Sequence, residues 1–186
     1  ASGGDLKLKG NYTVAKSSST TNNGRAVFFN GATEQTITKT GSGTINFDYL
    51  IIDKSGSGTN ADVKLVGDGG TTNVQINSSV NNSSLYRLQI INGNINLNGQ
   101  SFTLSGTAKN STNINVVNGT SKIYTSSGTG DFWIKGNPYG GSSNVLFNIQ
   151  GTTLTFDTGV TVPVAVGVDF VTLANKNLKN TILQIE

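Results

Sequence analysis

The chain of 186 residues is rich in Gly, Asn, Thr and Ser, and its 13 Lys and Arg stand against 10 Asp and Glu, a net charge of +3. It has no Cys and no His, which excludes disulfides and thiolate chemistry and removes the commonest general base and metal ligand. The basic residues are scattered, so we expect no nucleic-acid partner, which would require a clustered positive face. No apolar run approaches the roughly 20 residues of a membrane helix, so no membrane span is predicted.

The length suits a single domain over residues 1–186, in which Ala1–Gly4 form a loose leader. Short runs of alternating apolar and polar residues follow one another, which predicts strands with one buried face and no helix of normal length. Val160–Val168 is apolar too, but Pro163 disfavours a central strand there. The other predicted strands are Leu6–Leu8, Tyr12–Val14, Arg25–Asn30, Gln35–Thr40, Thr44–Lys54, Val63–Val66, Val74–Ile76, Leu85–Ile91, Asn94–Asn98, Ser101–Ser105, Ile114–Val117, Ile123–Tyr124, Asp131–Lys135, Val145–Ile149, Thr153–Phe156, Val168–Leu173 and Thr181–Ile185.

The longest predicted strand, Thr44–Lys54, changes its pattern halfway. Ile45, Phe47 and Tyr49 are spaced to share one face, whereas Leu50–Ile52 is fully apolar. This change predicts a bulge or a strand that is buried on both faces.

Turn residues about every ten positions are typical of all-β sandwiches, barrels and solenoids. The stretch Leu88–Gly106 (LQIINGNINLNGQSFTLSG) shows the ambiguity, because its Asn-Gly turns suit both hairpins and solenoid corners. Asn residues gather at these corners, and aligned amides in stacked coils hydrogen-bond to one another; they are Asn92, Asn94, Asn98, Asn115 and Asn118. We therefore predict an all-β, right-handed parallel β-helix or similar solenoid, with an antiparallel β-sandwich with a donated terminal strand as the alternative.

Part of the sequence is similar to a known kind of repeat. Ala26–Gly56 reads AVFFNGATEQTITKTGSGTINFDYLIIDKSG, and a strand at Val63–Val66 and then Leu88–Gly106 follow it. The region Arg25–Gly106 resembles the β-solenoid repeats of large secreted, adhesin-like surface proteins of Bacteroidetes and related bacteria. It departs from their pattern at two pairs, Asp48-Tyr49 and Tyr86-Arg87. The resemblance implies secretion, an extended β architecture and a role in surface contact or assembly, and it implies no catalytic residues.

The acidic residues give little support to catalysis. Glycoside hydrolysis uses two carboxylates on one face, but no two acids here occur as DD, DxD or ExE. Asp48 and Asp53 share one predicted strand, but their five-residue spacing places them on opposite faces. We therefore expect no enzyme, and a polysaccharide-active β-helix enzyme is the weakest of the alternatives.

The sequence offers two candidate ligand sites, a possible Ca²⁺ site at a glycine-rich turn and a set of aromatic residues. The Gly67–Gly70 turn (GDGG) occurs once, so an ordinary turn is favoured over a Ca²⁺ ion held by Asp62, Asp68 and carbonyl oxygens. No other metal or cofactor is expected. The aromatic residues favour core or cap positions over a sugar-stacking platform; they include Tyr49, Tyr86, Tyr124, Trp133 and Tyr139. Within this set, the possible ligand contacts are Trp133 and the loop residue Tyr139.

The two ends of a solenoid expose strand edges, and neither terminus contains an amphipathic helix to cover them. We expect the terminal strands to pair head-to-tail with other copies or with adjoining modules of a longer chain; the residues concerned are Leu6, Leu8, Ile182, Leu183 and Ile185. The first residue is not Met, which suggests a chain that is extracellular after removal of a signal peptide. The predicted function is a non-enzymatic structural protein of the cell exterior, a surface filament subunit or stalk module. An adhesin or glycan-binding module is the alternative.

Overall fold

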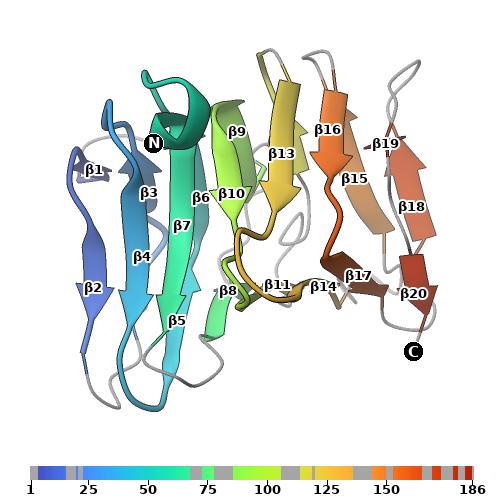
Figure 1. Ribbon diagram of the computed structural model, residues 1–186, viewed down its shortest axis with the longest axis horizontal. Helices are drawn as coiled ribbons and strands as arrows, with labels where there is room; N and C mark the ends of the chain where they lie inside the picture. The colour runs from blue at the N-terminus through green and yellow to red at the C-terminus, as the bar shows by residue number, and fades with distance from the viewer. Residues whose placement is uncertain are drawn as a thin grey trace.

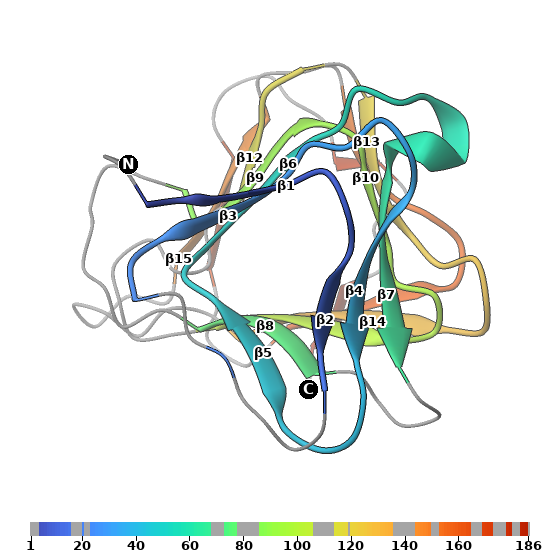
Figure 2. The same ribbon diagram turned by 90° about the vertical axis from the view of Figure 1, so that its left-hand side faces the viewer.

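The computed structural model describes residues 4–15, 20, 23–67, 73–77, 86–105, 114–118, 120–135, 144–149, 153–164, 169–172, 178–179 and 183–185. Along these residues the chain forms short strands and one 3-10 helix, η1 (Gly58–Ala61). The strands lie in three sheets that surround an apolar interior (Figures 1 and 2).

From β3 onward, successive strands contribute to sheets A, B and C in turn, so that strands adjacent in a sheet come from successive passes of the chain. Sheet A contains β1 (Leu6–Leu8), β3 (Ala26–Phe29), β6 (Tyr49–Asp53), β9 (Leu88–Asn92), β12 (Ile114–Val116), β15 (Asn144–Ile149) and β18 (Asp169–Thr172). Sheet B contains β2 (Tyr12–Val14), β4 (Gln35–Lys39), β7 (Asp62–Gly67), β10 (Asn94–Asn96), β13 (Thr120–Tyr124), β16 (Thr153–Phe156) and β19 (Leu178–Lys179). Sheet C contains β5 (Thr44–Phe47), β8 (Asn73–Asn77), β11 (Ser101–Ser105), β14 (Gly130–Ile134), β17 (Val160–Val164) and β20 (Leu183–Ile185).

The strand pairings between the described residues are parallel, so the alternative of an antiparallel sandwich is wrong. The turn between β10 and β11 shows why. Asn98 and Gly99 both have positive φ, 50° and 74°, as in a hairpin turn. The turn nevertheless leads from sheet B into sheet C, where β11 pairs with β8 and β14. Each pairing therefore joins segments far apart in sequence, and all-β architecture with three parallel sheets is confirmed.

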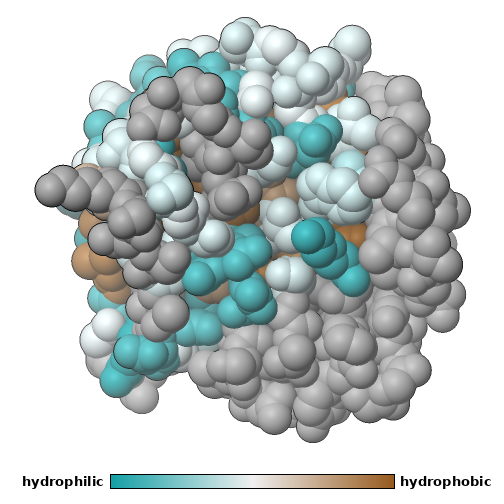
Figure 3. Space-filling model, turned by 90° about the horizontal axis from the view of Figure 1, so that it is seen from below, coloured by the Kyte–Doolittle hydropathy of each residue, from teal (hydrophilic) through white to brown (hydrophobic). Residues whose placement is uncertain are grey.

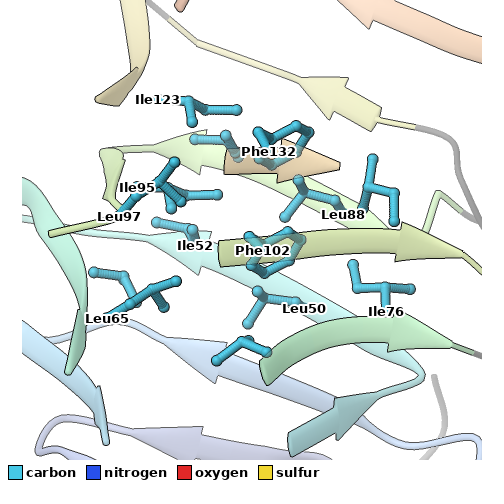
Figure 4. Packing of buried hydrophobic residues seen from close by; sticks show 14 of the residues in the cluster. Leu50, Ile52, Leu65, Ile76, Leu88, Ile95, Leu97, Phe102, Ile123 and Phe132 are labelled. Atoms are coloured by element: carbon cyan, nitrogen blue, oxygen red, sulfur yellow. The ribbon is translucent and has the colours of Figure 1, made fainter. Parts of the chain in front are cut away.

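Apolar side chains from the three sheets stack inside in register. Leu50 aligns with Leu88, and Leu88 aligns with Ile114, along sheet A. On sheet C the rings of Phe102 and Phe132 stack with 5.3 Å between centroids and 3° between planes (Figure 4). All five side chains are fully buried, each stabilising the fold by roughly 1.5–3 kcal/mol.

The predicted strand Thr44–Lys54 is two strands. The chain turns at Asp48, whose Oδ2 accepts the Gly24 amide at 2.7 Å, so Ile45 faces the interior whereas Tyr49 lies on the outer face of sheet A. The prediction of one shared face is therefore wrong for Tyr49. The predicted double burial and bulge are both confirmed in β6, which is buried on both faces and shifts register after Ile52.

Pro163 is a second departure from expectation, because it lies within β17, between β14 and β20. The register of β17 with β14 pairs Asp131 with Thr161 and Ile134 with Val164, and no pair is formed in between. The missing amide hydrogen of Pro163 therefore falls at an interruption of the ladder, which is where a sheet tolerates proline.

Asparagine side chains do join successive passes, but their partners differ from the predicted amide ladder. Asn92 Nδ2 donates to Asp53 Oδ1 at 3.2 Å. Asn98 Nδ2 donates to the Leu65 carbonyl at 3.1 Å, and its Oδ1 accepts the Ser126 hydroxyl at 3.1 Å. Carboxylates, hydroxyls and backbone carbonyls thus take the place of a second amide at these corners.

Candidate functional site

A groove crosses the outer face of sheet B, which faces the viewer in Figure 1. Its volume is about 560 Å³, and η1 contributes to one side of it. We call it the sheet B groove. Its side-chain lining comes from η1, β7, β10, β13 and the residue after β16, and it includes Thr59, Asp62, Asn94, Thr120, Lys122, Tyr124 and Asp157.

A buried carboxylate anchors this groove. Asp62, only 1% exposed, accepts the Tyr124 hydroxyl on Oδ2 and the Asn94 amide on Oδ1, the latter at 2.9 Å. Burial, followed by the hydrogen bond and the charge of Asp62, raises the pKa of Tyr124 well above its ordinary value of 10. Tyr124 therefore remains a neutral hydrogen-bond donor across the physiological pH range.

Further hydrogen bonds hold the same side chains in place. Asn96 Nδ2 donates to the Tyr124 hydroxyl at 3.3 Å and to Ser126 Oγ at 3.0 Å. Asn94 Oδ1 accepts the backbone amide of Lys122 at 3.1 Å. The network links β7, β10 and β13, so the polar side chains of the groove are fixed by three successive passes of the chain.

The groove's acids do not form a metal site in the part of the chain that the structure describes. No group of three or more His, Cys, Asp or Glu side chains is positioned there to hold an ion. Both oxygens of Asp62 accept hydrogen bonds from side chains, and Asp68, the other acid considered for Ca²⁺, lies outside the described residues.

Residues from the stretch Ala26–Gly56 meet at one corner between sheets A and B. Gln35 Oε1 accepts the Gly31 amide at 2.7 Å and the Lys54 ammonium at 2.6 Å. Lys54 Nζ also donates to the Thr33 carbonyl at 2.7 Å. Burial lowers the pKa of Lys54, while Asp62 and Glu34 act against that shift. The segments Phe29–Gly31, Gln35–Ile37 and Lys54–Gly56 thus contribute to a hydrogen-bonded corner with a structural role.

The two departures from the repeat pattern also meet. The Arg87 guanidinium lies 4.2 Å from the centroid of the Tyr49 ring, and its Nη1 donates to the Asp48 carbonyl at 3.5 Å. Arg87 is fully buried, and burial lowers its pKa. A cation on an aromatic ring in such a dry site is a stabilising contact. Sequence reasoning noted both pairs and missed that they compensate each other.

Tyr49 also belongs to an apolar cluster on the outer face of sheet A. Tyr49 and Ile51 pack there with Ala26, and Phe28 and Ile91 lie against them. A smaller groove of about 290 Å³ runs over this cluster and is bordered by polar side chains such as those of Lys7 and Gln89.

Trp133 lies on the outer face of sheet C and not in the core. It is half-buried beside Thr103, with which it aligns, and Lys135 Nζ lies 5.6 Å from its ring centroid. The described part of this face, seen in Figure 3, carries mostly hydrophilic side chains. Trp133 is therefore on a different sheet from the groove, and Tyr139 lies outside the described residues.

The predicted assembly residues lie at opposite ends of the sheets (Figure 1). Leu6 and Leu8 are in β1, the first strand of sheet A, and Leu6 is 42% exposed whereas Leu8 is half-buried. Leu183 and Ile185 are in β20, the last strand of sheet C, of which only the backbone is described. Ile182 lies outside the described residues.

Sequence reasoning singled out Asp62 and Tyr124 separately and did not bring them together, because 62 residues separate them. Asn94, Lys122 and Asp157 were not predicted as groove residues, and no local motif marks them. Among the described residues, no helix has both the length and the apolar character needed to cross a membrane. Comparison with protein-family models, with curated proteins and with solved structures gives no match for this chain.

Proposed function

We propose that the chain is a right-handed β-solenoid and a non-enzymatic structural module of the cell exterior, a surface filament subunit or stalk segment that continues end to end. The observation that carries the proposal is that sheets A and B are parallel throughout and end, among the described residues, in strands with one unpaired edge. The resemblance of Arg25–Gly106 to secreted surface repeats supports the extracellular location.

The backbone at the first edge is oriented to accept another strand. The Val14 carbonyl accepts the Thr40 amide at 3.1 Å, so Val14 faces β4. Because successive residues of a strand face opposite sides, the amide and carbonyl of Thr13 point toward the open side. The same reasoning applies in β1, where the Leu8 carbonyl accepts the Asn30 amide at 3.0 Å and Lys7 therefore faces outward.

Sheet C begins differently, because the described part of the first pass contributes only Thr20 to it. Thr20 forms a single parallel bridge with Ile45 of β5. The edges of β18, β19 and β20 at the other end run parallel to those of the first strands. Docking the last pass of one copy onto the first pass of the next would continue each sheet in the same direction. Such a head-to-tail contact does not close, so it produces a filament or an uninterrupted stalk.

Sedimentation velocity and negative-stain microscopy over a concentration series test this proposal. The wild-type chain is expected to form growing linear assemblies. Thr13→Pro removes an amide hydrogen from the open edge without touching the bonds to β4, and it should hold the chain as a monomer. Thr13→Val keeps that hydrogen and serves as the matched control.

Leu6→Lys places a charge at the exposed end of β1 and should weaken assembly in the same assay. A wild-type chain that remains monomeric at every concentration contradicts the filament and leaves only the stalk segment. Assembly that is equally strong in Thr13→Pro and Leu6→Lys contradicts pairing through these edges.

A further inference from the structure

We propose that the sheet B groove binds a neutral oligosaccharide. The proposal does not depend on end-to-end assembly. It starts from the strands that form the floor: β7, β10 and β13 are each paired on both sides, and their backbone groups are already used in the ladder. A peptide strand therefore finds no open edge here, and recognition must come from side chains.

The groove is wide enough for several linked sugar rings and not only for one small molecule. Its lining extends from Asp62 on β7, across β10 and β13, to Asp157 at the end of β16. Four neighbouring strands are three steps of about 4.8 Å, or roughly 14 Å across the sheet. A chain of linked sugar rings is long enough to extend across this width.

Tyr124 presents a ring rather than a hydroxyl to any ligand. Its hydroxyl donates to Asp62 and accepts a hydrogen from Asn96, so both of its hydrogen-bonding roles are engaged. The half-buried ring remains as the aromatic surface of the groove. The C–H face of a pyranose packs against such a ring, while its hydroxyls turn toward polar neighbours.

Those polar neighbours offer donors and acceptors together. Thr59 and Thr120 are exposed hydroxyls, and Lys122 is an exposed ammonium that can only donate. Asp157 can only accept, and its Oδ1 is held by the Thr158 amide at 2.9 Å. Each hydroxyl of a sugar both donates and accepts, which matches this mixture better than a ligand of one polarity does.

The charges of the groove argue against acidic ligands. Two carboxylates, Asp62 and Asp157, stand against the single ammonium of Lys122 in the lining. Lys54 also interacts with Asp62 from outside the lining, so the described part of the groove has no excess of positive charge that would attract a phosphorylated or uronic-acid ligand. Ala61 is the one wholly aliphatic side chain of the described lining, and its other apolar surface comes from the Tyr124 ring and the carbon atoms of polar residues. Polar groups beside apolar carbon surface suit a sugar, which carries both hydroxyls and C–H faces, better than a purely hydrophobic ligand.

Asp62 serves as a positioning residue. It holds the Tyr124 ring and the Asn94 amide before any ligand arrives, which lowers the entropy lost on binding. Asn94 keeps one amide hydrogen beyond the bond it donates to Asp62.

The test is a glycan array followed by calorimetric titration with purified fragments of neutral glucan, mannan, xylan and galactan. Sulfated and uronic-acid fragments are the comparison set. The wild-type chain should bind at least one neutral fragment and prefer it over its acidic counterpart. Tyr124→Ala is expected to weaken that binding about tenfold, the loss of one ring contact.

Because Tyr124→Ala also disturbs Asp62, a second variant keeps the proposal testable. Thr120→Ala combined with Lys122→Ala alters only exposed side chains and should also weaken binding several-fold. Lys64→Ala is the matched control, since Lys64 lies on the same face of sheet B outside the groove, and it should leave affinity unchanged.

Absence of binding to every neutral fragment overturns the proposal. Binding that survives the Thr120→Ala and Lys122→Ala double change, or that is lost equally in Lys64→Ala, places the ligand elsewhere and also overturns it. A preference for the acidic fragments contradicts the argument from charge.

Discussion

At the corner between sheets A and B, neighbouring atoms lie so close to Gly31 that the position has no room for a larger side chain. A Cβ atom at Gly31 would lie 2.7 Å from the Lys9 carbonyl oxygen and 2.9 Å from the Gln35 amide. Gln35 cannot move aside, because it donates to the Leu8 and Gly10 carbonyls while it holds Lys54. The space available at position 31 thus explains why a glycine stands there.

Gly31→Ala is therefore expected to lower the free energy of unfolding by about 1–3 kcal/mol, the usual cost of overpacking. Gly10→Ala is the matched change, since no atom lies within 4 Å of its Cβ position. Urea denaturation of both variants measures the difference. Equal midpoints would contradict the close-packed corner.

Tyr124 gives a second prediction at this scale, in the pH dependence of stability. Its pKa is raised in the folded chain, so the folded state keeps the phenol proton after the unfolded state has released it above pH 10. Stability from this group is present below pH 10 and is lost as the pH rises toward the folded-state pKa. Tyr124→Phe has no phenol proton to release, so the variant should not lose stability through this group as the pH rises.

The measurement is urea unfolding of the wild type and Tyr124→Phe at pH 7 and above pH 10. At pH 7 the variant should be less stable by about 1–3 kcal/mol, because the buried Asp62 loses a donor. The gap should narrow as the pH rises. A gap that is constant with pH would show that Tyr124 titrates alike in both states.

At the scale of the single strand, two adjacent residues of β14 lie on opposite faces, one in the core and one on the surface. Phe132 is fully buried between Phe102 and Phe156, with ring centroids 5.3 and 5.5 Å away, whereas Trp133 lies half-buried on the outer face. Phe132→Ala should cost about 3–5 kcal/mol by opening a cavity, and Trp133→Ala about 1 kcal/mol. Thermal denaturation of the two variants compares them, and a larger loss for Trp133→Ala would reverse the assignment of faces.

The alternation of residues was enough to predict most strands and their buried faces. Phe102 and Leu104 are both interior, because period-two patterning fixes which side chains share a face. Which strands pair with each other was harder to predict, since Asn98-Gly99 has the same local chemistry in a hairpin turn and in a solenoid corner. The corner at Asp48 was also not predicted, because the hydrogen bond that fixes it comes from Gly24, about one full pass earlier.

The residues of the sheet B groove could not be predicted from the sequence for a similar reason. Asp62, Asn94 and Tyr124 belong to three different passes, and their meeting depends on the register between β7, β10 and β13. Neither spacing nor composition encodes that register. The pairing of Arg87 with Tyr49 likewise joins distant segments, although both residues were visible as departures from the repeat.

At the scale of the whole molecule, each pass contacts its immediate neighbours, so stability is a sum of local and nearest-neighbour contributions. We expect hydrogen exchange to be fastest in β1 and β2, which have one neighbour, and slowest in β9–β11, which have two. Mass-spectrometric exchange at low protein concentration measures this gradient. Uniform protection along the chain would contradict additive stacking, whereas protection of β1 that grows with concentration would report assembly.

The placement of β1 and β20 at opposite ends of the molecule has a mechanical consequence. A pull applied to these two strands acts along the stack and loads the hydrogen bonds of one outer pass before those of the next. Detaching the whole first pass, β1 from β3, β2 from β4 and Thr20 from Ile45, would free the chain from Leu6 to its partner Val27, a spacing of 21 residues and about 70 Å when extended. Under tension the molecule would therefore lengthen in steps of one pass, absorbing work at each step while the remaining passes hold.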